Sequence, residues 1–250
     1  MVERLVQMAD NFWNVRGSFK VGGLLNVGTQ TSLVRRARGD FVLLDSYAFG
    51  GEVENEVMRL TDGGRSVVAV LNLHPFHTVH VKHTAERFAE AKLYGTRRHH
   101  ELAPGLSWQP ELTEGSSFRA LFEEDFVFSV PRGVDFIPAN SNLHFSSVLA
   151  FHPSSHTLHV DDTLTWISLP LVGGLRFHPT LAKTLKRSAG AVAEFREWLD
   201  ELTELCAPVR HLCTAHMHAL PPWPRPLAPL LHEAREKIEK TLSAHEKRFG

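Results

Sequence analysis

The segment Val67-Val68-Ala69-Val70-Leu71-Asn72-Leu73-His74-Pro75-Phe76-His77-Thr78-Val79-His80 joins an apolar run to a histidine at every third position. The apolar run predicts a buried strand, and residues 84–92 are compatible with a following helix. A loop at the carboxyl end of a buried strand is where an α/β sheet presents its ligands, and imidazole is the commonest metal ligand in proteins. We therefore predict that His74, His77 and His80 supply one half of a metal site. The alternative is that they are ordinary loop histidines.

The composition places the chain among ordinary globular proteins. It has 250 residues, of which 43% are hydrophobic and 22% charged, a length that suits one large domain or two small ones. The formal net charge is −1, so there is no electrostatic case for nucleic acid or for an anionic membrane surface as a partner. Histidine is the outlier, at 16 residues, and this excess needs a reason.

The cysteines and the amino terminus add two further expectations. The spacing of Cys206 and Cys213 matches neither a zinc knuckle nor a redox pair, so we expect both to be small buried hydrophobic residues. Residues 1–5 lack the apolar core of a signal peptide, and no stretch is long enough to cross a bilayer. We expect a cytoplasmic protein.

The pattern along the chain alternates between β-like and helical segments. Apolar runs bounded by turn residues predict strands, and apolar residues three and four apart predict helices. The predicted strands are 24–27, 32–35, 41–45, 66–71, 93–95, 126–130, 134–137, 147–151, 156–162 and 209–215. The predicted helices are 52–60, 84–92, 188–205 and 227–248, the last preceded by a proline-rich connector at 220–226.

Further ligand-type residues follow strands in the second half of the chain. One predicted strand ends at His152, the next leads to Asp162, and a later one finishes at His216. Strand alternation places His159 and Asp161 on one face of their strand, with Asp162 at its exit. Three separate strand ends therefore carry candidate ligands.

Together these segments resemble the metallo-β-lactamase superfamily, from about residue 26 to residue 218. Residues 32–45 resemble its first hairpin, which ends in a similar aspartate, and residues 71–74 resemble the strand that enters its histidine motif. The segment from Phe151 to Asp162 is most similar to a divergent branch. The resemblance implies an α+β fold, a four-layer αββα sandwich with mixed sheets formed by one domain over residues 1–250. It also implies one or two metals at one edge between the two sheets.

The resemblance also implies a ligand set. His74, His77 and His152 would form the first metal site, Asp162 would bridge, and His216 would belong to the second site. The superfamily motif His-x-His-x-Asp-His is degenerate here because its aspartate is missing, so we expect one tightly held metal and a weak second position. Three alternatives stay open: Asp161 for Asp162, His218 for His216, and His80 or His218 as an added ligand of the second site.

The ligand set predicts a metal-dependent hydrolase. Zinc is the first expectation, with iron or manganese as alternatives, and a bound zinc lowers the pKa of a water ligand toward about 7. The activated water would attack an ester, amide, thioester or phosphoester in a small-molecule substrate. Asp162 and His156 are the predicted catalytic residues, His156 as support or for proton transfer.

Two other functions fit the same residues. A mononuclear site of histidines and one carboxylate also suits ferrous iron, which would make the protein an oxidoreductase. Loss of the motif aspartate instead suits a non-catalytic member that binds a ligand or partner. The terminal helix 227–248 packs either on its own sheet or on a second subunit, so a homodimer stays open.

Overall fold

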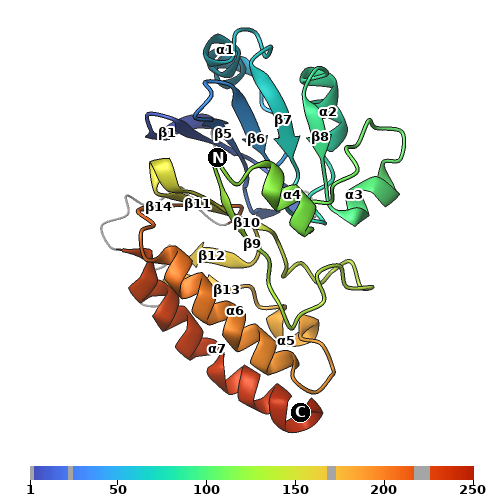
Figure 1. Cartoon of the computed structure of the whole chain (residues 1–250), viewed down its shortest axis with the longest axis vertical. Helices are drawn as coiled ribbons and strands as arrows, with labels where there is room; N and C mark the ends of the chain where they lie inside the picture. Colours follow the sequence, from blue (N-terminus) through green and yellow to red (C-terminus); the bar gives the residue numbers. More distant parts are fainter. Residues whose placement is uncertain (1–2, 22–24, 168–172, 217–225) are drawn as a thin grey trace. The chain divides into compact units, whose positions relative to one another are not determined.

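The computed structural model describes residues 3–21, 25–167, 173–216 and 226–250. The chain divides into two compact units, an N-terminal unit, Met1–Val127, and a C-terminal unit, Phe128–Gly250. Both units combine helices with β-sheet, so the predicted α+β class is confirmed (Figure 1). The expectation of a single domain stays a prediction. No helix among the described residues is long and apolar enough to cross a membrane.

The N-terminal unit is built on a six-stranded sheet in the order β1-β2-β5-β6-β7-β8. Pairing is antiparallel from β1 to β6 and parallel from β6 to β8, so the sheet is mixed. Its strands are β1 (Arg4–Ala9), β2 (Phe12–Gly17), β5 (Thr29–Arg35), β6 (Phe41–Leu44), β7 (Val67–Leu71) and β8 (Lys92–Tyr94), with a small ribbon of β3 (Lys20–Val21) and β4 (Leu25–Asn26). The helices are α1 (Gly51–Leu60), α2 (Val81–Arg87), α3 (Arg97–Leu102) and α4 (Ser116–Leu121).

The core of this unit explains why β7 forms. Val67 and Val70 of β7 pack with Val53 and Val57 of α1, which lie four residues apart on one helix face. Burying each such side chain stabilises the fold by about 1.5–3 kcal/mol. The packing fixes the end of β7, from which the histidine loop starts.

Several features of the N-terminal unit differ from the sequence prediction, and helices α3 and α4 are among those not predicted. The hairpin of β1 and β2 was not predicted. The helix expected at 84–92 is α2, Val81–Arg87, and it ends early because Phe88 leaves the helical conformation (φ −115°, ψ 56°). Phe88 is buried beside Phe49, with ring centroids 6.4 Å apart, so core packing overrides the helical pattern.

The C-terminal unit has a four-stranded sheet in the order β14-β11-β10-β9. These strands are β9 (Val127–Ser129), β10 (Leu149–His152), β11 (Thr157–Val160) and β14 (His211–Thr214), and a two-stranded ribbon adds β12 (Leu164–Ile167) and β13 (Gly174–Phe177). The short 3-10 turn Pro153–Ser155 joins β10 to β11. The helices are α5 (Leu181–Thr184), α6 (Ala191–Cys206) and α7 (Leu227–Phe249), and α6 and α7 run side by side (Figure 1).

The two long helices of this unit, α6 and α7, match their predicted segments closely, whereas α5 was not predicted. Phe195, Trp198 and Leu199 of α6 are buried with Leu231 and Leu242 of α7 in one core. The prediction of a strand at 134–137 was wrong, because only Val134 forms an isolated bridge, to Leu185. The ribbon of β12 and β13 was not predicted. The proline-rich connector predicted at 220–226 lies outside the described residues except for Pro226.

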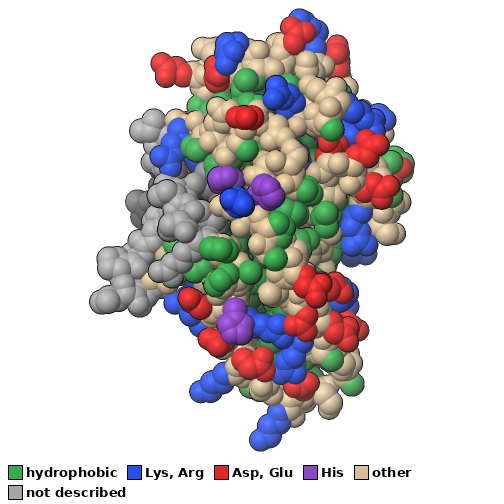
Figure 2. Space-filling model, turned by 60° about the vertical axis from the view of Figure 1, so that its left-hand side comes forward, with side chains coloured by type: hydrophobic (Ala, Val, Ile, Leu, Met, Phe, Trp, Pro, Cys, Tyr) green, Lys and Arg blue, Asp and Glu red, His purple; other side chains and the backbone are tan. Residues whose placement is uncertain are grey.

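The surface agrees with the near-zero net charge. On the face shown in Figure 2, Lys and Arg side chains are interleaved with Asp and Glu side chains. Among the exposed ion pairs of the N-terminal unit are Arg59–Glu56 and Arg65–Asp62. Such pairs contribute little to stability.

Candidate functional site

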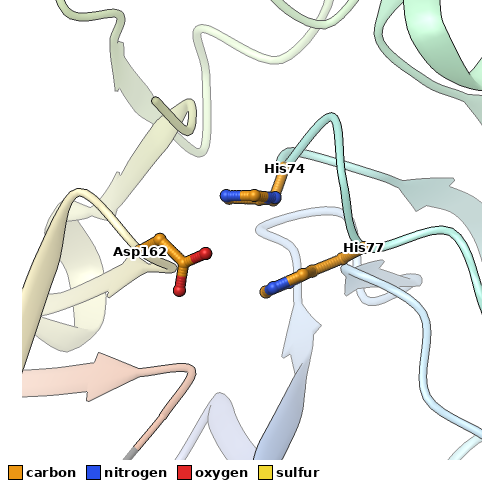
Figure 3. Close-up of side chains that lie close together, drawn as sticks. All are labelled: His74, His77 and Asp162. Carbon is orange, nitrogen blue, oxygen red and sulfur yellow. The ribbon is translucent and has the colours of Figure 1, made fainter. Parts of the chain in front are cut away.

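His74 and His77 form a stacked pair at the end of β7. The two ring centroids are 4.1 Å apart with an interplanar angle of 26°, and both rings project from the same loop (Figure 3). His74 is fully buried and His77 is half-buried. The N-terminal unit therefore presents two imidazoles side by side.

Asp45 holds the start of this loop. Its carboxylate Oδ1 accepts the backbone N–H of Leu73 at 2.7 Å and that of His74 at 3.4 Å. Asp45 is itself in the left-handed region, with φ 61°, and is almost fully buried. The aspartate that ends the predicted first hairpin thus positions the backbone of the first histidine.

His99 supports the loop from the other side, and the sequence analysis missed it. Its Nδ1 accepts the backbone N–H of Thr96 at 3.1 Å and faces the Thr96 hydroxyl at 2.9 Å, so the proton of the neutral ring lies on Nε2. Nε2 faces the carbonyl oxygen of His77 at 3.5 Å. Burial lowers the pKa of His99 to about 3, which keeps the ring neutral. The capping box of α3, Thr-x-x-His, is the signal that could have indicated this position.

The hydrogen bonds of His74 define what metal binding would require of it. Its Nδ1 accepts the backbone N–H of Phe76 at 3.1 Å, so the proton of the neutral ring lies on Nε2. A metal bound at Nε2 requires the proton on Nδ1, whereas a metal bound at Nδ1 competes with the Phe76 amide. Either mode gives up this hydrogen bond, at a cost of about 1 kcal/mol.

His80, the third histidine of the loop, packs elsewhere. It precedes α2 as the N-cap residue, and its ring lies edge-on to Tyr47 at 5.1 Å and to Phe19 at 6.5 Å. Burial, then the neighbouring His83 and His77, lower its pKa. Its assignment as a metal ligand stays a prediction, and the structure seats its ring in an aromatic setting instead.

In the C-terminal unit, one hairpin determines which residues lie together. Strands β10 and β11 are antiparallel, with Ala150 opposite His159 and His152 opposite Thr157. A hairpin returns the chain to its starting point, so residues just before β10 lie beside residues just after β11. The Thr163 hydroxyl joins the two ends: it accepts the backbone N–H of Ser147 at 3.0 Å.

His144, which precedes β10, and His216, which follows β14, flank the carboxylate of Asp162, because β14 pairs in parallel with β11. His144 Nδ1 lies 3.8 Å from Asp162 Oδ2, and His216 Nε2 lies 3.2 Å from Oδ1. Neighbouring ligands on a tetrahedral metal with bonds near 2.1 Å are about 3.4 Å apart, so these separations fit shared metal ligation. Asp162 is almost fully buried and is drawn in Figure 3.

The tautomer of His144 also suits a metal ligand. Its Nε2 lies within hydrogen-bond distance of the backbone carbonyl oxygen of Ser141, which therefore accepts the Nε2 proton. Nδ1 is left with its lone pair on the side of Asp162. Metal-ligating histidines commonly donate their other N–H in this way to a carbonyl or carboxylate. His144 was not among the ligands predicted from the sequence.

His178 is a fourth titratable residue near this group. Its Nδ1 lies 2.8 Å from the Thr180 hydroxyl and accepts the Thr180 backbone N–H at 3.4 Å, which leaves the ring proton on Nε2. Burial lowers the pKa of His178, while the charge of Asp162 raises it and His144 and His216 lower it. The sequence analysis did not assign it a role.

The hairpin register corrects the place given to His152. His152 lies at the turn end of β10, opposite Thr157, whereas Asp162 leaves the other end of β11. The four-residue strand β11, which spans about 13 Å, lies between His152 and Asp162. His152 is therefore at the opposite end of the hairpin from Asp162, and its ring contacts Ser155 Oγ at 2.8 Å.

His156 also lies at the turn end. It is exposed, adopts a left-handed conformation (φ 52°), and its Nδ1 donates to the carbonyl of Pro208 at 3.1 Å. His156 precedes β11 and Asp162 follows it, so the two lie at opposite ends of a strand about 13 Å long. A role of His156 in support or proton transfer stays a prediction.

Two alternatives were left open by the sequence, Asp161 in place of Asp162 and His218 in place of His216. Asp162 faces His144 and His216, whereas Asp161 lies just after β11, with its carboxylate 4.0 Å from His159 Nε2. The structure thus favours Asp162 over Asp161 as the carboxylate of the histidine group. His218 lies outside the described residues.

Comparison with solved structures identifies the fold. The chain matches the DIM-1 metallo-β-lactamase exposed to ceftazidime with a TM-score of 0.62 and 14% identity over 95% of this chain and 97% of the other. It matches the metallo-β-lactamase of Erythrobacter litoralis with 0.58 and 14%, over 98% and 96%. For the mono-zinc FIM-1 enzyme of Pseudomonas aeruginosa the values are 0.60 and 12%, over 95% and 96%. No family model and no curated protein matches the sequence. The predicted resemblance is confirmed at the level of the fold.

Proposed function

From its metallo-β-lactamase fold, we propose that this chain is a metal-dependent hydrolase. Each unit supplies candidate ligands: His74 and His77 in the N-terminal unit, and His144, Asp162 and His216 in the C-terminal unit. The observation that carries the proposal is the flanking of a buried carboxylate by two imidazoles at 3.2 and 3.8 Å. This donor set fits zinc, and it also suits iron or manganese.

The chain's own residues would divide the work. A bound divalent metal supplies Lewis-acid activation of water and of the oxygen under attack. Asp162 places a negative charge in a buried position. The Ser141 carbonyl accepts the Nε2 proton of His144, which leaves the Nδ1 lone pair of His144 to bind the metal. His178 carries its proton on Nε2, and the charge of Asp162 raises its pKa, opposing the effect of burial, so it can donate a hydrogen bond to the oxygen of a leaving group.

The substrate class is an ester, amide, thioester or phosphoester of a small molecule. All four react by attack of water on carbon or phosphorus, and all develop negative charge on an oxygen that a metal and a histidine N–H can stabilise. The three lactamases matched above share the fold at 12–14% identity, which does not select among these substrates.

Metal content tests the proposal. We expect about one equivalent of zinc, iron or manganese in tag-free protein, measured by elemental analysis. His77→Ala, His144→Ala and Asp162→Ala should each lower it about fivefold or more, because each removes a ligand. His152→Ala and the exposed His83→Ala are matched controls and should keep the wild-type content. If His77→Ala and His144→Ala both lose the same equivalent, the two groups hold the same ion.

Two results would overturn the proposal. One is wild-type protein that binds no metal after incubation with zinc, manganese or ferrous iron. The other is loss of metal from His152→Ala with full retention of metal in His144→Ala, which would show that His152, as first predicted, is the ligand and His144 is not. A panel of chromogenic esters, β-lactams and phosphoesters then tests hydrolysis, which a chelator should abolish and zinc restore.

A further inference from the structure

A groove in the C-terminal unit is lined by cations. It lies along α7 beside α5 and the segment after α5, with a volume of about 620 Å³. Lys183, Arg187, Lys237, Lys240 and Arg248 line it, and among the described residues no acidic side chain does. Within the described part of the chain, none of these five is ion-paired with a carboxylate.

The charges of α7 are sorted by helix face. Lys237, Lys240 and Arg248 are spaced so that they lie on the groove side, together with Thr241 and Ala244. The acidic residues of α7 are used elsewhere: Glu239 and Glu246 both bind Arg196 of α6, at 2.6 and 2.8 Å. Glu236 lies 3.4 Å from His232 on the same helix. The groove face is therefore positive although the helix as a whole is mixed.

Aromatic rings lie at one end of the groove. The rings of His245 and Phe249 are 4.7 Å apart, and both residues line it. The guanidinium carbons of Arg187 and Arg248 lie 5.9 and 5.0 Å from the centre of the Phe249 ring. The carbonyl of Lys186 lies 3.0 Å from His245 Nε2, which ties this end of α7 to the segment after α5.

From these features we propose that the groove binds the phosphate backbone of a single-stranded nucleic acid. From Lys237 to Arg248 the helix extends about 16 Å. A stacked strand carries one phosphate per about 3.4 Å, so about five phosphates face this length. Proteins that bind single strands without sequence preference combine a basic groove with rings on which bases stack.

The same features argue against other anions. One small phosphate compound would occupy only part of a row of cations this long. An acidic membrane requires apolar side chains on an exposed face, whereas the cations here line a hollow with Phe249 as its one large apolar side chain.

Salt-dependent binding tests the proposal. The probe is a fluorescent single-stranded DNA of about 12 nucleotides, titrated with full-length protein in EDTA so that no metal-dependent activity can degrade it. The slope of log K against log salt should be about −3.5 for five contacts. Lys237→Ala combined with Lys240→Ala should reduce the slope to about −2 and weaken binding about tenfold or more at low salt. Phe249→Ala should weaken binding about fivefold without changing the slope.

The control is Lys82→Ala combined with Lys92→Ala, which removes the same charge from exposed positions of the N-terminal unit and should leave binding unchanged. Three results would overturn the proposal: no binding of the DNA at low salt, equal weakening by the control, or binding only to vesicles that contain phosphatidylserine. Because EDTA is present, failure here leaves the proposed metal site untouched.

Discussion

The two groups of ligand-type residues are assembled in different ways. His74 and His77 come from one loop, three residues apart, and that loop is held by Asp45 and His99. The C-terminal group draws His144, Asp162 and His216 from three segments that only the hairpin and the parallel pairing of β11 with β14 bring together. The first group is a local arrangement supported by backbone hydrogen bonds, whereas the second is a product of topology.

Removal of the Asp45 carboxylate should have the largest effect, because it tests how the first group is held. Asp45→Ala leaves two buried backbone N–H groups without their acceptor and places alanine at φ 61°. We expect a loss of about 3–4 kcal/mol in the free energy of unfolding, measured by urea denaturation. Asp62→Ala is the control: Asp62 has φ 53° but an exposed side chain, so only about 1 kcal/mol of strain is expected. If both variants lose the same free energy of unfolding, the loss at Asp45 comes from alanine at a positive φ, and the two hydrogen bonds of the Asp45 carboxylate contribute nothing.

An effect of intermediate size should appear as the pH falls. His99 has an ordinary pKa near 6.5 when unfolded and about 3 when folded, so below about pH 6.5 the unfolded chain binds a proton that the folded chain does not. Its contribution to stability is therefore present above pH 6.5 and is lost as the pH falls toward 3. At pH 5 the loss is about 2 kcal/mol.

Unfolding of metal-free protein at neutral pH and at pH 5 measures this loss. His99→Gln should show a smaller decrease than the wild type by about 2 kcal/mol, whereas the exposed His83→Gln should follow the wild type. A wild-type decrease that His99→Gln leaves unchanged would assign the pH dependence to other residues and weaken the case for a rigid N-terminal loop.

The smallest expected effect is a pKa change in the C-terminal group. Asp162 raises the pKa of His178, opposing the effect of burial. Asp162→Asn should therefore lower the pKa of His178 further in metal-free protein, as followed by NMR of its ring protons. His211 is the control, since its pKa is lowered by burial, His156 and Arg210 and should not respond to Asp162. An unchanged pKa of His178 in Asp162→Asn would show that the fold does not hold Asp162 close to His178 in solution.

The contrast between the two groups also explains what the sequence could predict. The strand β7 and its histidine loop were predicted because apolar periodicity and ligand spacing are local signals. Both long helices, α6 and α7, were predicted for the same reason. The same local reasoning placed His152 in the site because a strand ends there.

His144 could not be found that way, because it precedes β10 rather than following it. Its position beside Asp162 depends on the antiparallel register and on the contacts of Ser147 with Thr163. His99 depends on its contact with a backbone carbonyl from another segment. The cationic groove was hidden in a similar way, because a net charge of −1 is a sum over the chain and contains no information about which helix face carries each charge.

The two ends of the β10–β11 hairpin differ in how well they can tolerate changes of sequence. Its turn at Pro153 and Ser154 is exposed, whereas its base is fixed by Thr163 next to His144 and Asp162. Residues inserted at the turn would extend the tip into solvent without changing the distance between His144 and Asp162. Evolution is therefore free to lengthen this tip, and a fluorescent label or an affinity peptide can be attached there with little risk to the ligand geometry.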